Sequence, residues 1–134
     1  MNIHEATRSY EHWLAQQTKV VRADLKRKHS FMTEAPFLFF RATFYRWLQL
    51  WPQACVEDTR APKVLGIGDI HIENFGTWRD HDGRLVWGVN DFDEVWQYPY
   101  TVDLVRLATS ALLAIQAEHL SLPGKVACAQ IMEG

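Results

Sequence analysis

Apolar and polar positions in the first fifty residues follow the helical period. Between Ile3 and about Lys28, apolar residues recur at steps of three and four, which predicts one amphipathic helix. The polar stretch Ser30–Pro36 interrupts this pattern, and Pro36 is suited to the first turn of a following helix. The aromatic-rich stretch from Phe37 to about Leu50 then predicts a second helix, closed by Trp51-Pro52.

The pattern in the middle of the chain changes to short apolar runs separated by polar residues. The run Lys63–Leu65 predicts a buried strand, and Leu85–Val89 predicts another. The pair Asp82-Gly83 between them indicates a hairpin, because glycine readily takes the positive φ that tight hairpin turns need. We therefore expect a strand, a polar loop, a short hairpin, a second strand and a second polar loop.

The last third of the chain predicts helices again. The stretch Val95–Tyr100 is interpreted as a loop with an aromatic cluster. Thr101 is suited to cap a helix that runs to about Leu120, with Asp103 in its first turn, and Lys125–Met132 begins another helix. The sequence stops there without a cap, and we expect it to be a fragment of a longer protein.

These elements predict a mostly helical α+β fold. The 134 residues correspond to one domain, which we divide into an N-terminal helical part (1–52), a hairpin region (63–95) and C-terminal helices (101–134). The hydrophobic content of 48% and the aromatic content of 13% are typical of a folded protein. The aromatic residues of the second helix are interpreted as core, or alternatively as an interface: Phe37, Phe39, Phe40, Phe44, Tyr45 and Trp47.

Charge and composition restrict the classes of partner. The formal net charge of −2 gives no overall basic field for nucleic acid, although the cluster Lys26–His29 is either a basic patch or the favourable charge of a helix C-terminus. No signal peptide and no apolar stretch of spanning length is found, and Cys55 and Cys128 lack zinc-type spacing. We expect a soluble, cytoplasmic protein that binds no membrane or nucleic acid.

The chemistry is concentrated in the two polar loops. Asp69 and Asn74 lie in the first, and Asp91 lies in the second. The predicted strands bring both loops together, and carboxylate and amide oxygens suit Mg²⁺. Asp93 and Glu94 could join this metal site or be solvated, and the sequence leaves both alternatives open.

A resemblance to known enzymes lies in the first loop, Gly68-Asp69-Ile70-His71-Ile72-Glu73-Asn74-Phe75. It resembles the G-D-x-H-x-x-N catalytic loop of aminoglycoside- and choline-kinase-like phosphotransferases. In that family an Asp-Phe or Asp-Trp pair follows a strand, here Asp91-Phe92, and an Asp-Leu pair opens a later helix, here Asp103-Leu104. The resemblance implies a fold like the C-terminal, catalytic lobe of a protein kinase.

A second resemblance covers about residues 41–114. This stretch is similar to an uncharacterised bacterial family, domain of unknown function 2252 (DUF2252). The shared segments are Phe40-Arg41, the G-D-x-H-x-x-N-F-G loop and the run Asn90–Glu94. Three spaced elements in the same order make the resemblance specific.

The kinase-like resemblance implies roles for individual residues. Asp69 matches the catalytic aspartate that orients the attacking hydroxyl, and His71 matches a residue of the same catalytic loop that braces it. Asn74 and Asp91, with Asp93 as a further candidate, match ligands that hold Mg²⁺ against the phosphates of ATP. Asp103 matches a buried carboxylate that accepts hydrogen bonds from the loop backbone, or is an ordinary helix-start residue. The implied partners are a nucleotide and a small-molecule substrate.

One departure from the kinase pattern keeps a non-catalytic alternative open. No glycine precedes Gly66, so no Gly-rich phosphate loop lies ahead of the motif. Either a nucleotide lobe follows Gly134 or the phosphates are held differently, with Arg41 as a candidate ligand or as an arginine that extends from an aromatic helix to solvent. A pseudokinase-like interaction domain is therefore an alternative. A metallophosphoesterase is a weaker one, because Asp69-Ile70-His71 resembles its D-x-H motif but its G-D-x-x-D, G-N-H and G-H-x-H motifs are not found.

Overall fold

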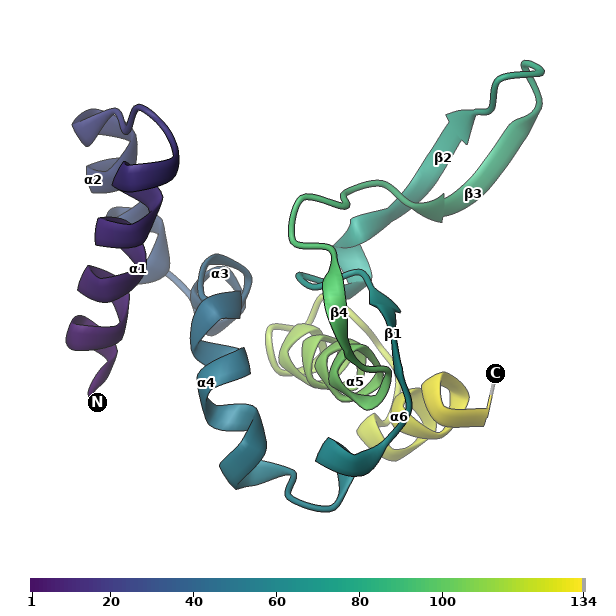
Figure 1. The fold of residues 1–134 in the computed structure, drawn as a ribbon. Coiled ribbons are helices and arrows are strands. Elements are labelled where there is room, and N and C mark those ends of the chain that lie inside the picture. Colours follow the sequence, from purple (N-terminus) through teal and green to yellow (C-terminus); the bar gives the residue numbers. More distant parts are fainter. Residues whose placement is uncertain (134) are drawn as a thin grey trace. The chain divides into compact units, whose positions relative to one another are not determined.

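The protein has a mostly helical α+β fold, as predicted. The computed structural model describes residues 1–133 (Figure 1), which form six α-helices and two antiparallel two-stranded sheets. The chain divides into two compact units, Met1–Ala54 and the described residues from Cys55 onward. The helices of the first unit are α1 (Ile3–Gln17), α2 (Arg22–Met32), α3 (Pro36–Ala42) and α4 (Phe44–Ala54).

The predicted helix from Ile3 to Lys28 is wrong, because the chain turns between α1 and α2. A capping box starts α1: Asn2 Oδ1 accepts from the Glu5 amide at 2.9 Å, and Glu5 Oε2 accepts from the Asn2 amide at the same distance. Thr18 then takes an extended conformation (φ −151°, ψ 165°), and α2 lies beside α1 (Figure 1). The contact of His29 with Glu11 joins the two helices, and helical periodicity does not encode a contact of this kind.

The prediction of one helix from Phe37 to Leu50 is also wrong, because this stretch forms two helices. Pro36 occupies the first turn of α3, as predicted, but Thr43 (φ −129°, ψ 38°) separates α3 from α4. The Thr43 hydroxyl donates to the Phe39 carbonyl at 2.7 Å, an alternative hydrogen bond that short polar side chains offer the backbone. Helix α4 continues through Pro52 to Ala54, whereas the sequence predicted that the helix ends at Trp51-Pro52.

Aromatic side chains form the core of the first unit, in agreement with the interpretation of that stretch. Phe37, Phe40 and Phe44 are buried, whereas Phe39 is 37% exposed. Aromatic contacts of Tyr45 extend to α1, where its ring stacks on Tyr10 with centroids 4.4 Å apart. These contacts position α1 against α4 within this unit.

The second unit contains a sheet that joins two distant segments. Strand β1 (Lys63–Gly66) pairs antiparallel with β4 (Trp96–Pro99), with Val64 opposite Tyr98. The prediction of a loop at 95–100 is therefore wrong. The prediction of a buried β1 is wrong as well, because Leu65 is 75% exposed. A sheet of two strands leaves one face open, and here only the Tyr98 side of β4 is covered.

A β-hairpin forms where Asp82-Gly83 predicted it. Strand β2 (Phe75–Arg79) pairs with β3 (Leu85–Val89), and Figure 1 shows the hairpin extending away from α5. Gly83 has φ +77°, which a glycine adopts without strain. Asp80 closes the turn, because its Oδ1 accepts the amides of Asp82 and Arg84 at 3.0 and 2.9 Å.

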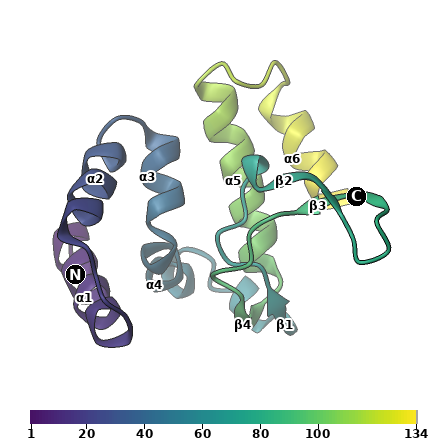
Figure 2. The same ribbon diagram turned by 90° about the horizontal axis from the view of Figure 1, so that it is seen from above.

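Two helices complete the second unit. Helix α5 (Thr101–Gln116) packs beside α6 (Gly124–Glu133), as Figure 2 shows. The prediction that Thr101 caps α5 is wrong: Tyr100 is the N-cap, and the Thr101 hydroxyl donates to the Asp58 carbonyl at 3.1 Å. Helix α5 ends four residues before Leu120, because Glu118 takes a left-handed φ of 59°. No helix within residues 1–133 is long and apolar enough to span a bilayer.

Candidate functional site

The two polar loops predicted to face each other are joined by the side chain of Asn74. This side chain is 5% exposed, and its Oδ1 accepts the Asp91 amide at 2.9 Å. Its Nδ2 lies 3.3 Å from the carbonyl oxygens of both Asp69 and Asp91. The backbone adds a further link, because the Asn90 amide donates to the Asn74 carbonyl at 2.9 Å. One buried amide therefore holds the loop that starts at Gly68 beside the loop that starts at Asn90.

A close backbone approach joins the two loops at a second point. Gly68 has φ +95°, and a Cβ built on it would lie 2.4 Å from the Glu94 carbonyl oxygen. Only glycine fits such a contact, and it also avoids strain at this φ. The Gly68 carbonyl accepts the Ile70 amide at 2.7 Å, so the chain turns sharply at Asp69 itself.

A polar stripe on α5 anchors the first loop. Its members are Asp103, Arg106 and Ser110, whose spacing of three and four places them on one helical face. Asp103 accepts the Ile67 amide at 2.7 Å and the Gly68 amide at 3.3 Å. The predicted bracing of the loop backbone by Asp103 is thus confirmed, although this side chain is only part-buried.

Ser110 anchors the loop farther along. It has no exposed surface, and its Oγ accepts the Ile72 amide at 3.1 Å while donating to the Leu107 carbonyl at 2.7 Å. With Asp103 at one end and Ser110 at the other, α5 fixes both sides of Asp69. No sequence motif indicated this role for Ser110.

The Asp69 carboxylate itself pairs with Arg106. Arg106 Nη2 donates to Asp69 Oδ1, and the arginine side chain is 1% exposed against 26% for the aspartate. Burial lowers the pKa of Arg106, while the Asp69 carboxylate acts in the opposite direction. The guanidinium remains a cation and fixes the direction of the carboxylate.

Sequence reasoning did not identify Arg106. A signal was available: Arg106 follows Asp103 by three residues inside an apolar helix, where a charge needs a partner because an uncompensated buried charge is costly. That signal predicts some partner for the arginine. It does not identify Asp69, which lies 37 residues away in the sequence.

Tyr98 supports Asp103 from β4. The Tyr98 ring is buried, and its hydroxyl donates to Asp103 Oδ1 at 2.8 Å. Burial, together with the Asp103 carboxylate, raises the pKa of Tyr98 well above its usual value. The ring lies against Gly66, where a Cβ would come within 2.2 Å of it. The β1–β4 sheet thus positions the Tyr98 hydroxyl to donate a hydrogen bond to Asp103, the carboxylate that braces the loop.

The predicted metal ligands supply hard oxygen donors. Asp91 and Asp93 are exposed on the second loop, and Asp91 Oδ1 accepts the Asp93 amide at 3.1 Å. One lone pair of Asn74 Oδ1 is used by the Asp91 amide, which leaves a second for another contact. This donor chemistry fits Mg²⁺, which keeps several waters and takes few protein ligands. Within residues 1–133, no group of three His, Cys, Asp or Glu side chains is arranged to hold a metal ion.

The two remaining predicted site residues occupy different settings. His71 is 3% exposed, and its carbonyl accepts the Asn74 amide at 2.9 Å. The bracing role of His71 stays a prediction. Arg41 is exposed on α3, in the first compact unit, so its contact with phosphate stays a prediction.

Comparison with known proteins identifies a family. Residues 20–133 match the family model described as an uncharacterised protein conserved in bacteria (DUF2252). No curated protein and no solved structure gives a significant match. The matched range includes both loops and the polar stripe of α5.

Proposed function

The chain belongs to the DUF2252 family, and we propose that it carries the catalytic lobe of a kinase-like phosphotransferase. The reaction would transfer a phosphoryl group from ATP to a hydroxyl of a small molecule, with Mg²⁺ as cofactor. Phosphoryl transfer depends mainly on positioning and on neutralising charge, and it needs little covalent chemistry from the protein. A site of rigidly held polar side chains is therefore the kind of site that phosphoryl transfer requires.

One observation carries the proposal: the buried Asn74 side-chain amide forms hydrogen bonds with the backbone of Asp69 and with the backbone of Asp91. The proposal requires the residue that orients the acceptor hydroxyl and the residues that hold the metal to share one space. The hydrogen bonds from the Asn74 side chain to the Asp91 backbone, at 2.9 and 3.3 Å, join the loops and support that requirement. Loops directed to opposite sides of the unit would have excluded it.

Each residue has a defined part in the proposed reaction. Asp69, directed by Arg106, would accept the hydrogen bond of the acceptor hydroxyl and orient its oxygen. Asp91 and Asp93, with the remaining lone pair of Asn74, would hold Mg²⁺. When bound, the ion would neutralise phosphate charge. Arg41 lies in the first compact unit, and its candidacy as a phosphate ligand rests only on the bidentate geometry of its guanidinium.

Nucleotide-dependent thermal unfolding tests the proposal. We expect ATP with Mg²⁺, at concentrations far above the dissociation constant, to raise the unfolding temperature by roughly a few degrees. The shift should vanish in Asp91→Ala and persist in Asp82→Ala, which removes an exposed carboxylate at the hairpin turn. A shift with Mn²⁺ or Zn²⁺ alone would instead indicate a metallophosphoesterase.

A non-catalytic interaction domain is the second candidate, and one observation favours it. Large apolar side chains of the hairpin are exposed, including Leu85 at 67% and Trp87 at 69%. Exposed apolar surface of this kind often marks contact with another protein surface. No thermal shift with nucleotide or metal, in a protein that unfolds cooperatively, would favour this candidate over the enzyme.

A further inference from the structure

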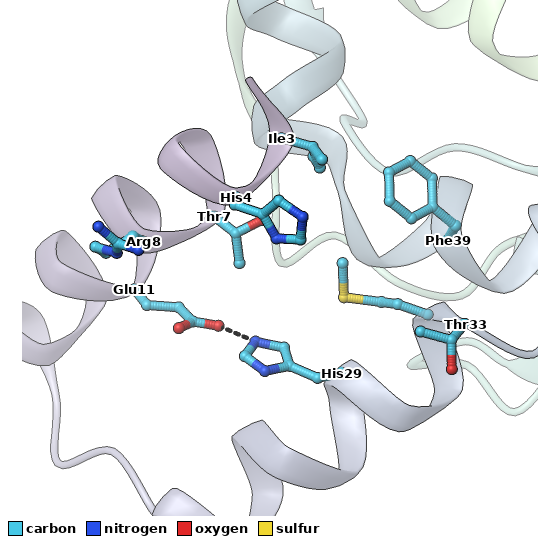
Figure 3. Close-up of a pocket in the computed structure, with 9 residues that line it drawn as sticks. Ile3, His4, Thr7, Arg8, Glu11, His29, Thr33 and Phe39 are labelled. Atoms are coloured by element: carbon cyan, nitrogen blue, oxygen red, sulfur yellow. Dashed lines mark hydrogen bonds and ion pairs between the residues drawn. The ribbon is translucent and has the colours of Figure 1, made fainter. Parts of the chain in front are cut away.

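A pocket in the first compact unit lies outside the site described above. It has a volume of about 410 Å³ and opens between α1, α2 and α3 (Figure 3). Ile3, Met32 and Phe39 supply its apolar surface, and Figure 3 shows the Phe39 ring directed into it. The volume lies within the range of small-molecule sites, and such sites combine an apolar lining with a few polar groups. Methionine adapts its shape to different ligands.

The acidic side chain in the pocket wall is already engaged. Glu11 Oε1 lies 2.5 Å from His29 Nε2, which joins α1 to α2 across the pocket (Figure 3). Thr7 is engaged as well, because its hydroxyl lies 2.7 Å from the Tyr45 hydroxyl. Neither group needs a ligand to satisfy it.

Two basic side chains in the same wall have no such partner. Arg8 and His4 lie one helical turn apart on α1, and neither forms a hydrogen bond or ion pair with any residue in the described range 1–133. Arginine is always charged and binds carboxylates with two parallel hydrogen bonds. The polar groups left to a ligand are therefore the Arg8 guanidinium, which only donates and carries a permanent positive charge, and the His4 ring, which can donate from one nitrogen.

We propose that this pocket binds a small organic anion that has a flat or branched apolar body. The body would rest on Ile3, Met32 and Phe39, and the anionic head would meet His4 and Arg8. The Arg8 side chain is exposed and points away from the Phe39 ring in Figure 3, so it would turn toward the bound head. A neutral apolar molecule would leave the guanidinium unused, and a small inorganic anion would leave the apolar surface empty. This inference does not depend on the phosphotransferase proposal, because its residues lie outside both polar loops.

Three probes of matched shape test the proposal on the full chain by amide NMR titration. The probes are 2-naphthoate, 2-naphthamide, which has the same body without the charge, and acetate, which has the head alone. We expect 2-naphthoate to shift the amide signals of Thr7, Met32 and Thr33. It should bind at least about fivefold more tightly than 2-naphthamide, and acetate should not saturate in the same range.

Substitutions then locate the head group. Arg8→Gln should weaken binding of 2-naphthoate by about tenfold and leave binding of 2-naphthamide unchanged. Arg22→Gln is the matched control, since Arg22 is exposed on α2 and does not line the pocket. His4→Gln provides a second variant, with a smaller loss expected, and circular dichroism checks that each variant keeps its helices.

Several outcomes would overturn the proposal. They are equal binding of the acid and the amide, an unchanged affinity in Arg8→Gln, or signal changes confined to the exposed aromatic residues of the second unit. An absence of saturation by 2-naphthoate up to millimolar concentration would overturn it too. None of these results would change the outcome of the ATP-dependent thermal-shift experiment with Asp91→Ala. The pocket proposal and the phosphotransferase proposal can therefore fail independently.

Discussion

Arg106 donates a hydrogen bond to the carboxylate of Asp69 from a side chain that is 1% exposed, whereas the aspartate is 26% exposed. The two partners therefore depend on each other unequally. If Arg106 is removed, water can reach part of the Asp69 carboxylate. If the charge of Asp69 is removed, a buried cation loses its direct carboxylate partner. This asymmetry makes the ion pair a sensitive test of the structure.

Substitution of the two partners should have different costs for stability. We expect Asp69→Asn to lower the free energy of unfolding by about 3 kcal/mol, the lower end of the range for breaking a buried ion pair, because Glu94 and Asp103 still act on the guanidinium. Arg106→Met, which keeps apolar volume, should cost roughly 1 to 3 kcal/mol. Denaturant unfolding of both variants and of the double variant measures the difference and the coupling. A larger cost for Arg106→Met than for Asp69→Asn would contradict this geometry.

Glycine positions in the second unit should differ in their tolerance of a methyl group. Gly68 and Gly83 both have positive φ, but a Cβ at Gly68 would meet the Glu94 backbone, whereas one at Gly83 would meet nothing within 4 Å. Gly83→Ala should therefore cost about 1 kcal/mol from backbone strain alone. Gly68→Ala should cost roughly 3 kcal/mol, because steric overlap adds to the same strain. Thermal unfolding of the pair separates the two terms, and equal costs would mean that the loops do not approach closely.

Removal of the Asn74 side-chain amide should weaken the link between the second loop and the first. We expect Asn74→Ala to lower the free energy of unfolding by about 2 kcal/mol, since the Asp91 amide loses its acceptor. The local readout is hydrogen exchange of the Asp91 amide, which should become markedly faster. Asp93→Ala, at an exposed position of the same loop, is the control and should leave that exchange slow. Unchanged protection in Asn74→Ala would show that other contacts join the loops.

The hydroxyl of Tyr98 should make stability depend on alkaline pH. Burial and the Asp103 carboxylate raise the pKa of Tyr98 in the folded protein, whereas the unfolded value is about 10. The neutral phenol is thus favoured by folding, and its contribution is complete below pH about 10. Above that pH the unfolded state releases the proton first, so stability falls by up to about 1.4 kcal/mol per pH unit.

Comparison with Tyr98→Phe isolates this effect. At pH 8 the variant should be less stable than the parent by roughly 1 to 2 kcal/mol, because Asp103 loses a hydrogen-bond donor. The difference should shrink between pH 10 and 11.5, where only the parent loses the Tyr98 contribution. The pKa of Tyr45 is raised by burial too, but that residue is present in both proteins and cancels from the difference. A constant difference across this pH range would contradict a raised pKa at Tyr98.

Local patterns in the sequence were sufficient to predict those features that depend on neighbouring residues in the chain. Asp82-Gly83 predicted the β2–β3 hairpin, because the turn conformation depends on adjacent residues. Pro36 at the start of α3 and Asp103 in the first turn of α5 follow from positional preferences of the same kind. The G-D-x-H-x-x-N motif, with Asp91 and Asp103 after it, predicted which residues of the two loops and of α5 lie together.

Tertiary structure alone decided the features that need contacts between distant residues. The pairing of β4 with β1, the turn after α1 and the partner of Arg106 all join segments that periodicity treats as independent. Side-chain alternation and helical period describe one segment at a time, whereas pairing energy depends on which other segment lies opposite. For that reason the sequence by itself determined the positions of the two polar loops along the chain. Folding determined that Asn74 would join them and that α5 would hold Asp69 in place.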